Sequence, residues 1–211
     1  MQKRSQKTQG IVYVLIAAFG FSLMSMFVKL AGDLPSFEKA FFRNFVALIF
    51  IVILMLRSRT SFRPERRNLP ALAGALGGLG AGAAYTFVRY LGARGENGSR
   101  IVFYFSAFSC LACLPFLLLD YAPMSARQLV YLLLAGVFAC VGQLGITKAY
   151  VCAPAKEISV YDYTQVLYAA ALGFFVFGEV PDWLSVLGYV LICGAGVGMF
   201  LYNRRHDAAH P

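Results

Sequence analysis

The sequence predicts an all-α polytopic membrane protein with about seven transmembrane helices. Hydrophobic residues make up 59% of the 211 residues and charged residues only 14%, whereas a soluble domain usually carries about 25% charge. The apolar residues form seven continuous runs, each close to the ~20 residues with which a helix crosses a hydrocarbon core of ~30 Å. They do not alternate with polar residues, as they would in a transmembrane β-barrel.

Short linkers separate the seven runs and leave no room for a soluble domain. The first run follows Lys3, Arg4 and Lys7, as the apolar part of a signal peptide would, but it exceeds the usual length of about 7–15 residues. We therefore expect it to be a retained first span with a cytoplasmic amino terminus. The runs cover residues 11–30, 37–56, 70–88, 101–119, 128–150, 155–177 and 183–202.

The net charge of +9 does not indicate a nucleic-acid partner, because the basic residues cluster at the ends of apolar runs, where lipid headgroups lie. This placement favours a multi-pass protein of the cell membrane that contacts the lipid bilayer. Five cysteines lie in or beside apolar runs. Cys110 and Cys113 have the spacing of metal ligands, but neither a second pair nor a histidine accompanies them. No metal or cofactor is expected.

The distribution of Lys and Arg conflicts with seven spans. If every run crossed, nine basic residues would lie in the segments on the amino-terminal side and seven in those on the other side, which is no positive-inside bias. If the run 70–88 does not cross, or if an odd number of helices is missing beside it, the later segments change sides. The counts then become fifteen against at most four.

A short similarity between two segments of the chain also indicates that its two halves have opposite orientations. Residues 27–32 (FVKLAG) resemble residues 87–92 (FVRYLG), and an aromatic apolar helix follows each segment. The intervening loops differ in sign, since the first carries acids and the second carries Arg94 and Arg100. Similar helix pairs with opposite flanking charge are typical of an inverted repeat.

The residues that open and close the chain resemble those of the EamA-like carriers of the drug/metabolite transporter superfamily. The opening segments are 19–23 (FGFSL), Lys29 and 42–44 (FRN), and the closing segment is 178–181 (GEVP), followed by Gly188, Ile192 and Gly194. The resemblance covers about residues 10–203. It implies ten helices in two inverted five-helix repeats, with both ends cytoplasmic.

Compared with this pattern of ten helices, the chain is expected to lack part of the first repeat. Residues 70–203 resemble a complete second repeat of five helices, and residues 11–56 resemble two helices of the first. Three helices would be missing at about residues 67–69, and this odd number would explain the conflict in charge. Gln165 stands where the family usually has a proline. A homodimer could supply the missing walls of a central cavity.

Polar residues within the apolar runs are costly in a bilayer and are therefore candidates for function. We predict a pocket for a small metabolite, with hydrogen-bonding and aromatic groups at its wall. Each candidate has a structural alternative: an arginine that snorkels, an interfacial tyrosine or a hydrogen bond between helices. The predicted substrate-binding residues are Arg43, Tyr85, Gln143, Tyr161, Gln165 and Tyr168.

Other features carry weaker expectations. Asp162 is either the acceptor of a coupling proton or an interfacial acid. Glycines spaced by four at Gly74, Gly78 and Gly82, and at Gly194 and Gly198, are typical of close helix packing. The run 70–88 is the least apolar, so it is the best candidate for a segment that does not cross.

The function favoured by these features is a membrane carrier of small metabolites that exports amino acids or related compounds by alternating access. The alternative is a truncated remnant that transports nothing, or a membrane interaction protein. An enzyme is not supported, because the only histidines, His206 and His210, lie in the tail and no buried acids are paired at a suitable spacing.

Overall fold

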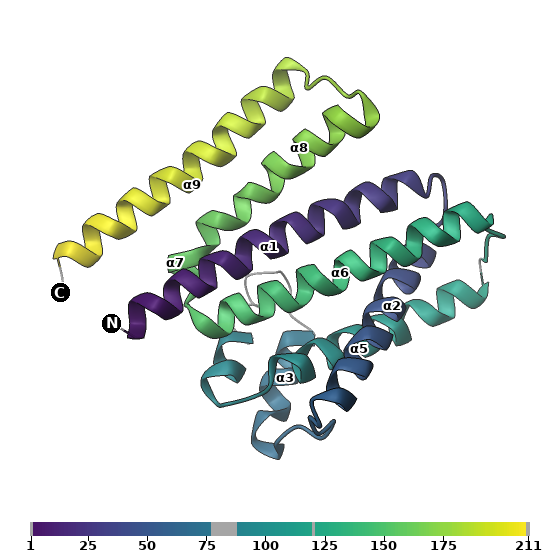
Figure 1. Cartoon of the computed structure of the whole chain (residues 1–211), viewed down its shortest axis with the longest axis horizontal. Coiled ribbons are helices and arrows are strands. Elements are labelled where there is room, and N and C mark those ends of the chain that lie inside the picture. Colours follow the sequence, from purple (N-terminus) through teal and green to yellow (C-terminus); the bar gives the residue numbers. More distant parts are fainter. Residues whose placement is uncertain (1, 77–87, 120, 210–211) are drawn as a thin grey trace.

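The computed structural model describes residues 2–76, 88–119 and 121–209, and these residues form helices without any strand (Figure 1). Six helical segments of the described residues are long and apolar enough to cross a membrane. The elements are α1 (Gln2–Leu30), α2 (Ser36–Arg57), the short 3-10 helix η1 (Arg66–Asn68), α3 (Leu69–Leu76), α5 (Gly98–Leu119), α6 (Ala126–Cys152), α7 (Ala155–Ile158), the 3-10 helix η2 (Ser159–Tyr163), α8 (Thr164–Phe177) and α9 (Trp183–Ala209).

The six spans coincide with six of the seven predicted runs and confirm an all-α polytopic membrane protein. The remaining run, 70–88, contains α3, which is only eight residues long, and residues 77–87, which lie outside the described part of the chain. Gly78, Gly82 and Tyr85 are among the latter, so the structure says nothing of the roles predicted for them.

Helix α6 is the centre of the fold and packs along α1 (Figure 1). Small residues allow the close crossing: a Cβ added to Gly142 would lie 2.7 Å from the ring of Phe21, and one added to Gly20 would lie 3.1 Å from the backbone nitrogen of Gly142. Van der Waals packing of this kind is the main attraction between helices in lipid. The amino end of α6 is fixed by a capping box of Ser125 and Gln128.

Two flanking units pack against this central pair. Helices α2 and α5 lie on one side, and the hairpin formed by α8 and α9 lies on the other (Figure 1). The turn of the hairpin begins at Gly178, whose φ of 66° suits a residue without a Cβ. Asp182 then caps α9 by accepting a hydrogen bond from the backbone of Ser185 at 2.8 Å.

Contacts between loops show which chain segments share a side of the helix bundle. We define the basic side by the amino terminus and the loops 58–68, 94–97 and 153–158, and the opposite side by the loops 31–35, 121–125 and 178–182. On the basic side, Lys7 pairs with Glu157 at 3.4 Å, and Arg94 Nη1 donates to the carbonyl of Arg67 at 3.4 Å. On the opposite side, Gln128 donates to the carbonyl of Ala31 at 3.1 Å. Both termini lie at the same end of the structure (Figure 1).

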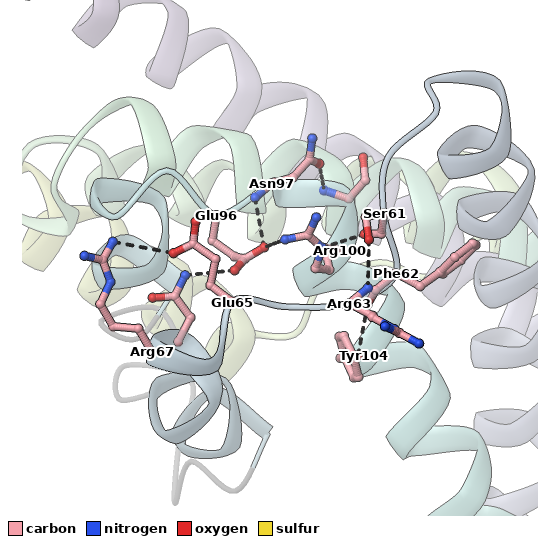
Figure 2. Close-up of polar contacts among 11 residues, drawn as sticks. Ser61, Phe62, Arg63, Glu65, Arg67, Glu96, Asn97, Arg100 and Tyr104 are labelled. Carbon is pink, nitrogen blue, oxygen red and sulfur yellow. Dashed lines mark hydrogen bonds and ion pairs between the residues drawn. The ribbon is translucent and has the colours of Figure 1, made fainter.

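The two ends of the run 70–88 are joined on the basic side by a buried polar cluster (Figure 2). The carboxylate of Glu96 accepts hydrogen bonds from Asn68 Nδ2 at 2.9 Å and from Arg100 Nη1. Arg100 Nε also donates to the carbonyl of Ser61 at 2.7 Å. The chain before and after this run therefore lies at the same end of the helix bundle. This is the arrangement in which the Lys and Arg counts become fifteen against at most four.

The close packing expected at Gly194 and Gly198 is absent. A Cβ added at either position would meet no atom within 4 Å. Helix α9 instead meets η2 at Gly196, where an added Cβ would lie 2.7 Å from the ring of Tyr163. The rest of α9 is largely exposed, and only 6% of the apolar window of this span is buried.

Candidate substrate cavity

A large hollow of about 710 Å³ opens between α8 and α9. This volume is within the range of about 300–1,000 Å³ that is typical of small-molecule sites. Its wall combines small apolar residues of α8 with polar side chains from both helices and from the turn between them. The lining residues are Asp162, Tyr163, Gln165, Val166, Ala169, Ala170, Gly173, Glu179, Val180, Pro181, Asp182, Ser185 and Tyr189.

A second hollow of about 160 Å³ lies on the other side of α8, against α1. It shares Ala169, Gly173 and Glu179 with the large cavity. On α1 it is lined by Ser22, Ser25, Met26 and Lys29. Ser22, Ser25 and Lys29 are spaced by three and four, so they share a polar face of this helix. Helix α8 thus separates the large cavity from the smaller hollow.

An ion pair joins α1 to the turn of the hairpin at the opposite side. Lys29 Nζ donates to the carboxylate of Glu179 and lies 4.6 Å from the centre of the Phe177 ring. Both charged side chains are about half exposed, at 51% and 55%. Glu179 is therefore held at the boundary of both hollows by a residue from outside the hairpin.

The inner end of the large cavity carries Asp162. Its Oδ2 accepts a hydrogen bond from the hydroxyl of Tyr150 on α6 at 3.0 Å, and Tyr150 is 2% exposed. At the other end of the cavity, hydrogen bonds from Ser185 hold the pKa of Asp182 below its ordinary value, since they favour the charged carboxylate. The cavity thus has a carboxylate near each end.

Of the predicted residues that lie in the described part of the chain, Gln165 alone is at the wall of the large cavity. Its backbone carbonyl also lies 3.1 Å from the hydroxyl of Ser22 on α1. Tyr168 packs edge-on against Phe19, with ring centres 5.4 Å apart. Tyr161 packs against the buried core near Ile158. Gln143 is half-buried on α6 and lines neither hollow.

The spacings of four and three between Tyr161, Gln165 and Tyr168 predict one common face of an α-helix. This common face is not present, for a local reason. Tyr161 belongs to the 3-10 helix η2, and the α-helix begins only at Thr164. A 3-10 helix has about 3.0 residues per turn instead of 3.6, so the α-helical spacing cannot be continued through this junction. Tyr161 consequently turns toward the core, and Asp162 and Tyr163 take the places at the cavity.

Arg43 lies away from both hollows, on α2. It is half-buried, and its Nη1 is 3.7 Å from the sulfur of Met24 on α1. No carboxylate of the described residues lies within ion-pair distance of it. The arginine is therefore a charge between helices rather than a wall of the cavity seen here.

Ser185 and Tyr189 are cavity residues that were not predicted. They are four residues apart and so share a face of α9, which is a pattern visible in the sequence. In the sequence, Glu179 is an acid just past a helix end, which is a typical exposed position. Only the turn at Gly178 and the contact with Lys29 show that it borders both hollows.

Comparison with known proteins supports a transporter. A family model described as the EamA-like transporter family matches residues 68–201. Two curated relatives are the pseudopaline exporters CntI of Pseudomonas aeruginosa strains UCBPP-PA14 and PAO1; each is 31% identical over 153 residues, or 72% of this chain and 54% of the relative. The chain thus spans about half the length of these relatives. No solved structure shows a significant similarity to it. Since the family model covers more than half of the residues, the chain belongs to the EamA-like transporter family.

Proposed function

We propose that this protein is a membrane carrier that exports a small metabolite, and that the cavity between α8 and α9 binds this metabolite. Membership of the EamA-like transporter family is the observation that carries the proposal. The relatives that export pseudopaline are its second support, since pseudopaline exporters act on a small molecule. Amino acids and related compounds are the substrate class that we expect.

The cavity wall provides groups that can bind such a solute. Gln165, Ser185 and Tyr189 provide hydrogen-bonding groups without a permanent charge, and Val166 and Ala169 provide apolar surface. Polar groups that fix the orientation of a solute, beside apolar surface that it can bury, are what a specific small-molecule site requires. In this proposal Gln165 is the central residue, because it lies inside the span 159–177 and lines the cavity.

Alternating access requires one unit to move against another. Helices α1 and α6 cross at van der Waals contact through Gly20 and Gly142, so we propose that they form the fixed unit. The hairpin of α8 and α9 is the moving unit. None of the apolar window of the span 159–177 is buried inside the protein, which leaves the hairpin free to tilt.

The orientation and the organisation of the chain complete the proposal. We propose that the basic side is cytoplasmic, because fifteen of the nineteen Lys and Arg residues lie at or next to it and basic loops stay inside. Residues 11–56 would form part of a first repeat and residues 70–203 a second, in agreement with a family match over 68–201. A homodimer is proposed as the assembly that closes the cavity.

An export assay tests the function. Cells that express the protein are loaded with a panel of radiolabelled amino acids and related metabolites, and the efflux is compared with that of cells carrying an empty vector. We expect faster efflux of at least one compound. Equal efflux across the whole panel would contradict the proposal.

A variant ties that activity to the cavity. Gln165→Leu removes the amide and should lower the affinity for the exported compound by roughly twofold to tenfold, the usual effect of one hydrogen bond. Gln9→Leu makes the same change on α1, where the side chain is exposed and outside the cavity, and should leave efflux unchanged. If Gln165→Leu and Gln9→Leu cells export the compound with the same affinity, the cavity between α8 and α9 is not its binding site.

A further inference from the structure

The ion pair between Lys29 and Glu179 has the composition of a site that recognises an ammonium group. The ammonium of Lys29 is held by a carboxylate on one side and by the ring of Phe177, 4.6 Å away, on another. A carboxylate combined with an aromatic face is the arrangement that binds organic cations. The group that now occupies this arrangement belongs to the protein itself.

The carboxylate of this arrangement stands at the boundary of the proposed substrate cavity, whereas the ring of Phe177 lines only the smaller hollow. Glu179 lines the 710 Å³ cavity as well as the smaller hollow, whereas Lys29 reaches it only from the smaller one. A solute in the large cavity therefore meets the carboxylate of Glu179 from the side that Lys29 does not use.

The charge of the cavity wall favours a cation. The described lining includes the carboxylates of Asp162, Glu179 and Asp182 and no lysine, arginine or histidine. Asp162 and Asp182 have neutral partners, since they accept hydrogen bonds from Tyr150 and Ser185. Glu179 is the lining carboxylate that has a cationic partner. A concave surface with charges of one sign concentrates solutes of the opposite sign.

We propose that the cavity takes a solute that carries an ammonium group, and that this group replaces the ammonium of Lys29 on Glu179. The inference rests on the proposed function and names its substrate class. The exchange leaves no carboxylate unpaired, because one ammonium leaves as another arrives. Lys29 is half exposed at the end of α1, so its long side chain can move to the membrane surface.

This exchange would also connect binding with movement. Lys29 belongs to α1 and Glu179 to the turn of the α8–α9 hairpin, so their ion pair joins the fixed unit to the moving one. A solute that takes over Glu179 opens this link. The pair is exposed enough to contribute little to stability, so its loss alone should not unfold the protein.

Binding of matched amines and alcohols tests the inference. The probes are butylamine with 1-butanol, phenethylamine with 2-phenylethanol, and tryptamine with tryptophol, each applied to the purified full chain in lipid nanodiscs with empty nanodiscs as the blank. We expect at least one amine to bind roughly tenfold more tightly than its alcohol, as the gain of a charged hydrogen bond predicts. Equal binding within every pair, or no binding of any amine, would overturn the inference.

Variants test whether Glu179 causes the preference for an amine over its matched alcohol. Glu179→Gln should abolish the difference between amine and alcohol, and Lys29→Met should tighten amine binding by roughly threefold because it removes the competitor. Glu157→Gln is the matched control: it breaks the Lys7–Glu157 pair at the other end of α1 and should keep the preference. The double variant Lys29→Glu with Glu179→Lys restores an ion pair and should still lose the preference, which a purely structural role would not predict.

The outcome is distinct from that of the export assay. Efflux of a compound without an ammonium group, together with equal binding of amines and alcohols, would keep the proposed function and reject this inference. Retention of the amine preference by Glu179→Gln would likewise reject it. Absence of any efflux would reject the proposed function itself.

Discussion

At the scale of single residues, Gly142 fixes the distance between α6 and α1. An added Cβ would lie 2.7 Å from two ring atoms of Phe21, so Gly142→Ala must displace a ring at the crossing of the helices. We expect a loss of about 1–3 kcal/mol in the free energy of unfolding, the usual effect of overpacking. Thermal unfolding in detergent measures it.

The control for this variant is another glycine in a transmembrane helix. Gly194→Ala adds the same methyl group where nothing lies within 4 Å, and alanine favours a helix more than glycine does. The stability of Gly194→Ala should equal or exceed that of the wild type. A larger loss at Gly194 than at Gly142 would contradict the packing described for both helices.

The buried cluster at Glu96 makes a second prediction at this scale (Figure 2). The side chain of Glu96 is only 2% exposed, and that of its partner Arg100 is 14% exposed. Glu96→Ala leaves the charge of Arg100 and the amide of Asn68 without their carboxylate, so we expect a loss of about 3 kcal/mol.

An exposed pair in the same region is the control for Glu96→Ala. Glu65 lies 3.5 Å from Arg67, and both side chains are more than 60% exposed. Glu65→Ala should change the free energy of unfolding by less than about 1 kcal/mol. Equal losses for the two variants would show that the cluster at Glu96 does not hold the ends of the run 70–88 together.

At the scale of elements, the sequence was sufficient to locate the spans. The runs 37–56, 101–119 and 128–150 lie within α2, α5 and α6 and miss their ends by at most three residues. Continuous apolar runs bounded by charged, glycine and proline residues are reliable signals, because an unpaired backbone is too costly in lipid.

The orientation of the helices about their axes was not predictable in the same way. Lipid is as apolar as a neighbouring helix, so residues that face lipid and residues that face protein have similar hydropathy. The spacing of Tyr161, Gln165 and Tyr168 predicts one face, but Tyr161 belongs to the 3-10 helix η2 whereas the other two belong to α8. The contact of Lys29 with Glu179 joins residues 150 positions apart, which no local pattern predicts.

The exposed face of α9 makes a prediction about assembly. Gly194 and Gly198 face open space and are flanked by Val190, Leu191 and Val197, all exposed. If a homodimer closes the cavity, Gly194→Cys should form a crosslink between two copies in native membranes, because small residues allow helices to approach closely. Gly136→Cys, on the buried crossing of α6 with α2, is the control that should not crosslink. Absence of a crosslink at Gly194 and Gly198 alike would reject this face as the dimer interface.

At the scale of the whole molecule, the distribution of charge and the contacts between loops agree. Fifteen basic residues lie at or near the side that contains both termini, and the other four are Lys29, Lys39, Arg43 and Arg127. The sequence predicted this division only on the condition that the run 70–88 does not cross or that an odd number of helices is missing beside it. The hydrogen bond between Asn68 and Glu96 places the chain before and after this run at one end of the bundle, which agrees with the first condition.

The most direct test of the account is a map of cysteine accessibility. Single cysteines at positions 60, 95, 124 and 207, in a background without the five native cysteines, are labelled in intact cells with a reagent that does not cross the membrane. Positions 60, 95 and 207 should be protected until the cells are opened, and position 124 should react at once. Labelling of position 95 from outside, with position 60 protected, would show that the run 70–88 crosses the membrane and would contradict the proposed orientation, in which positions 60, 95 and 207 share the cytoplasmic side.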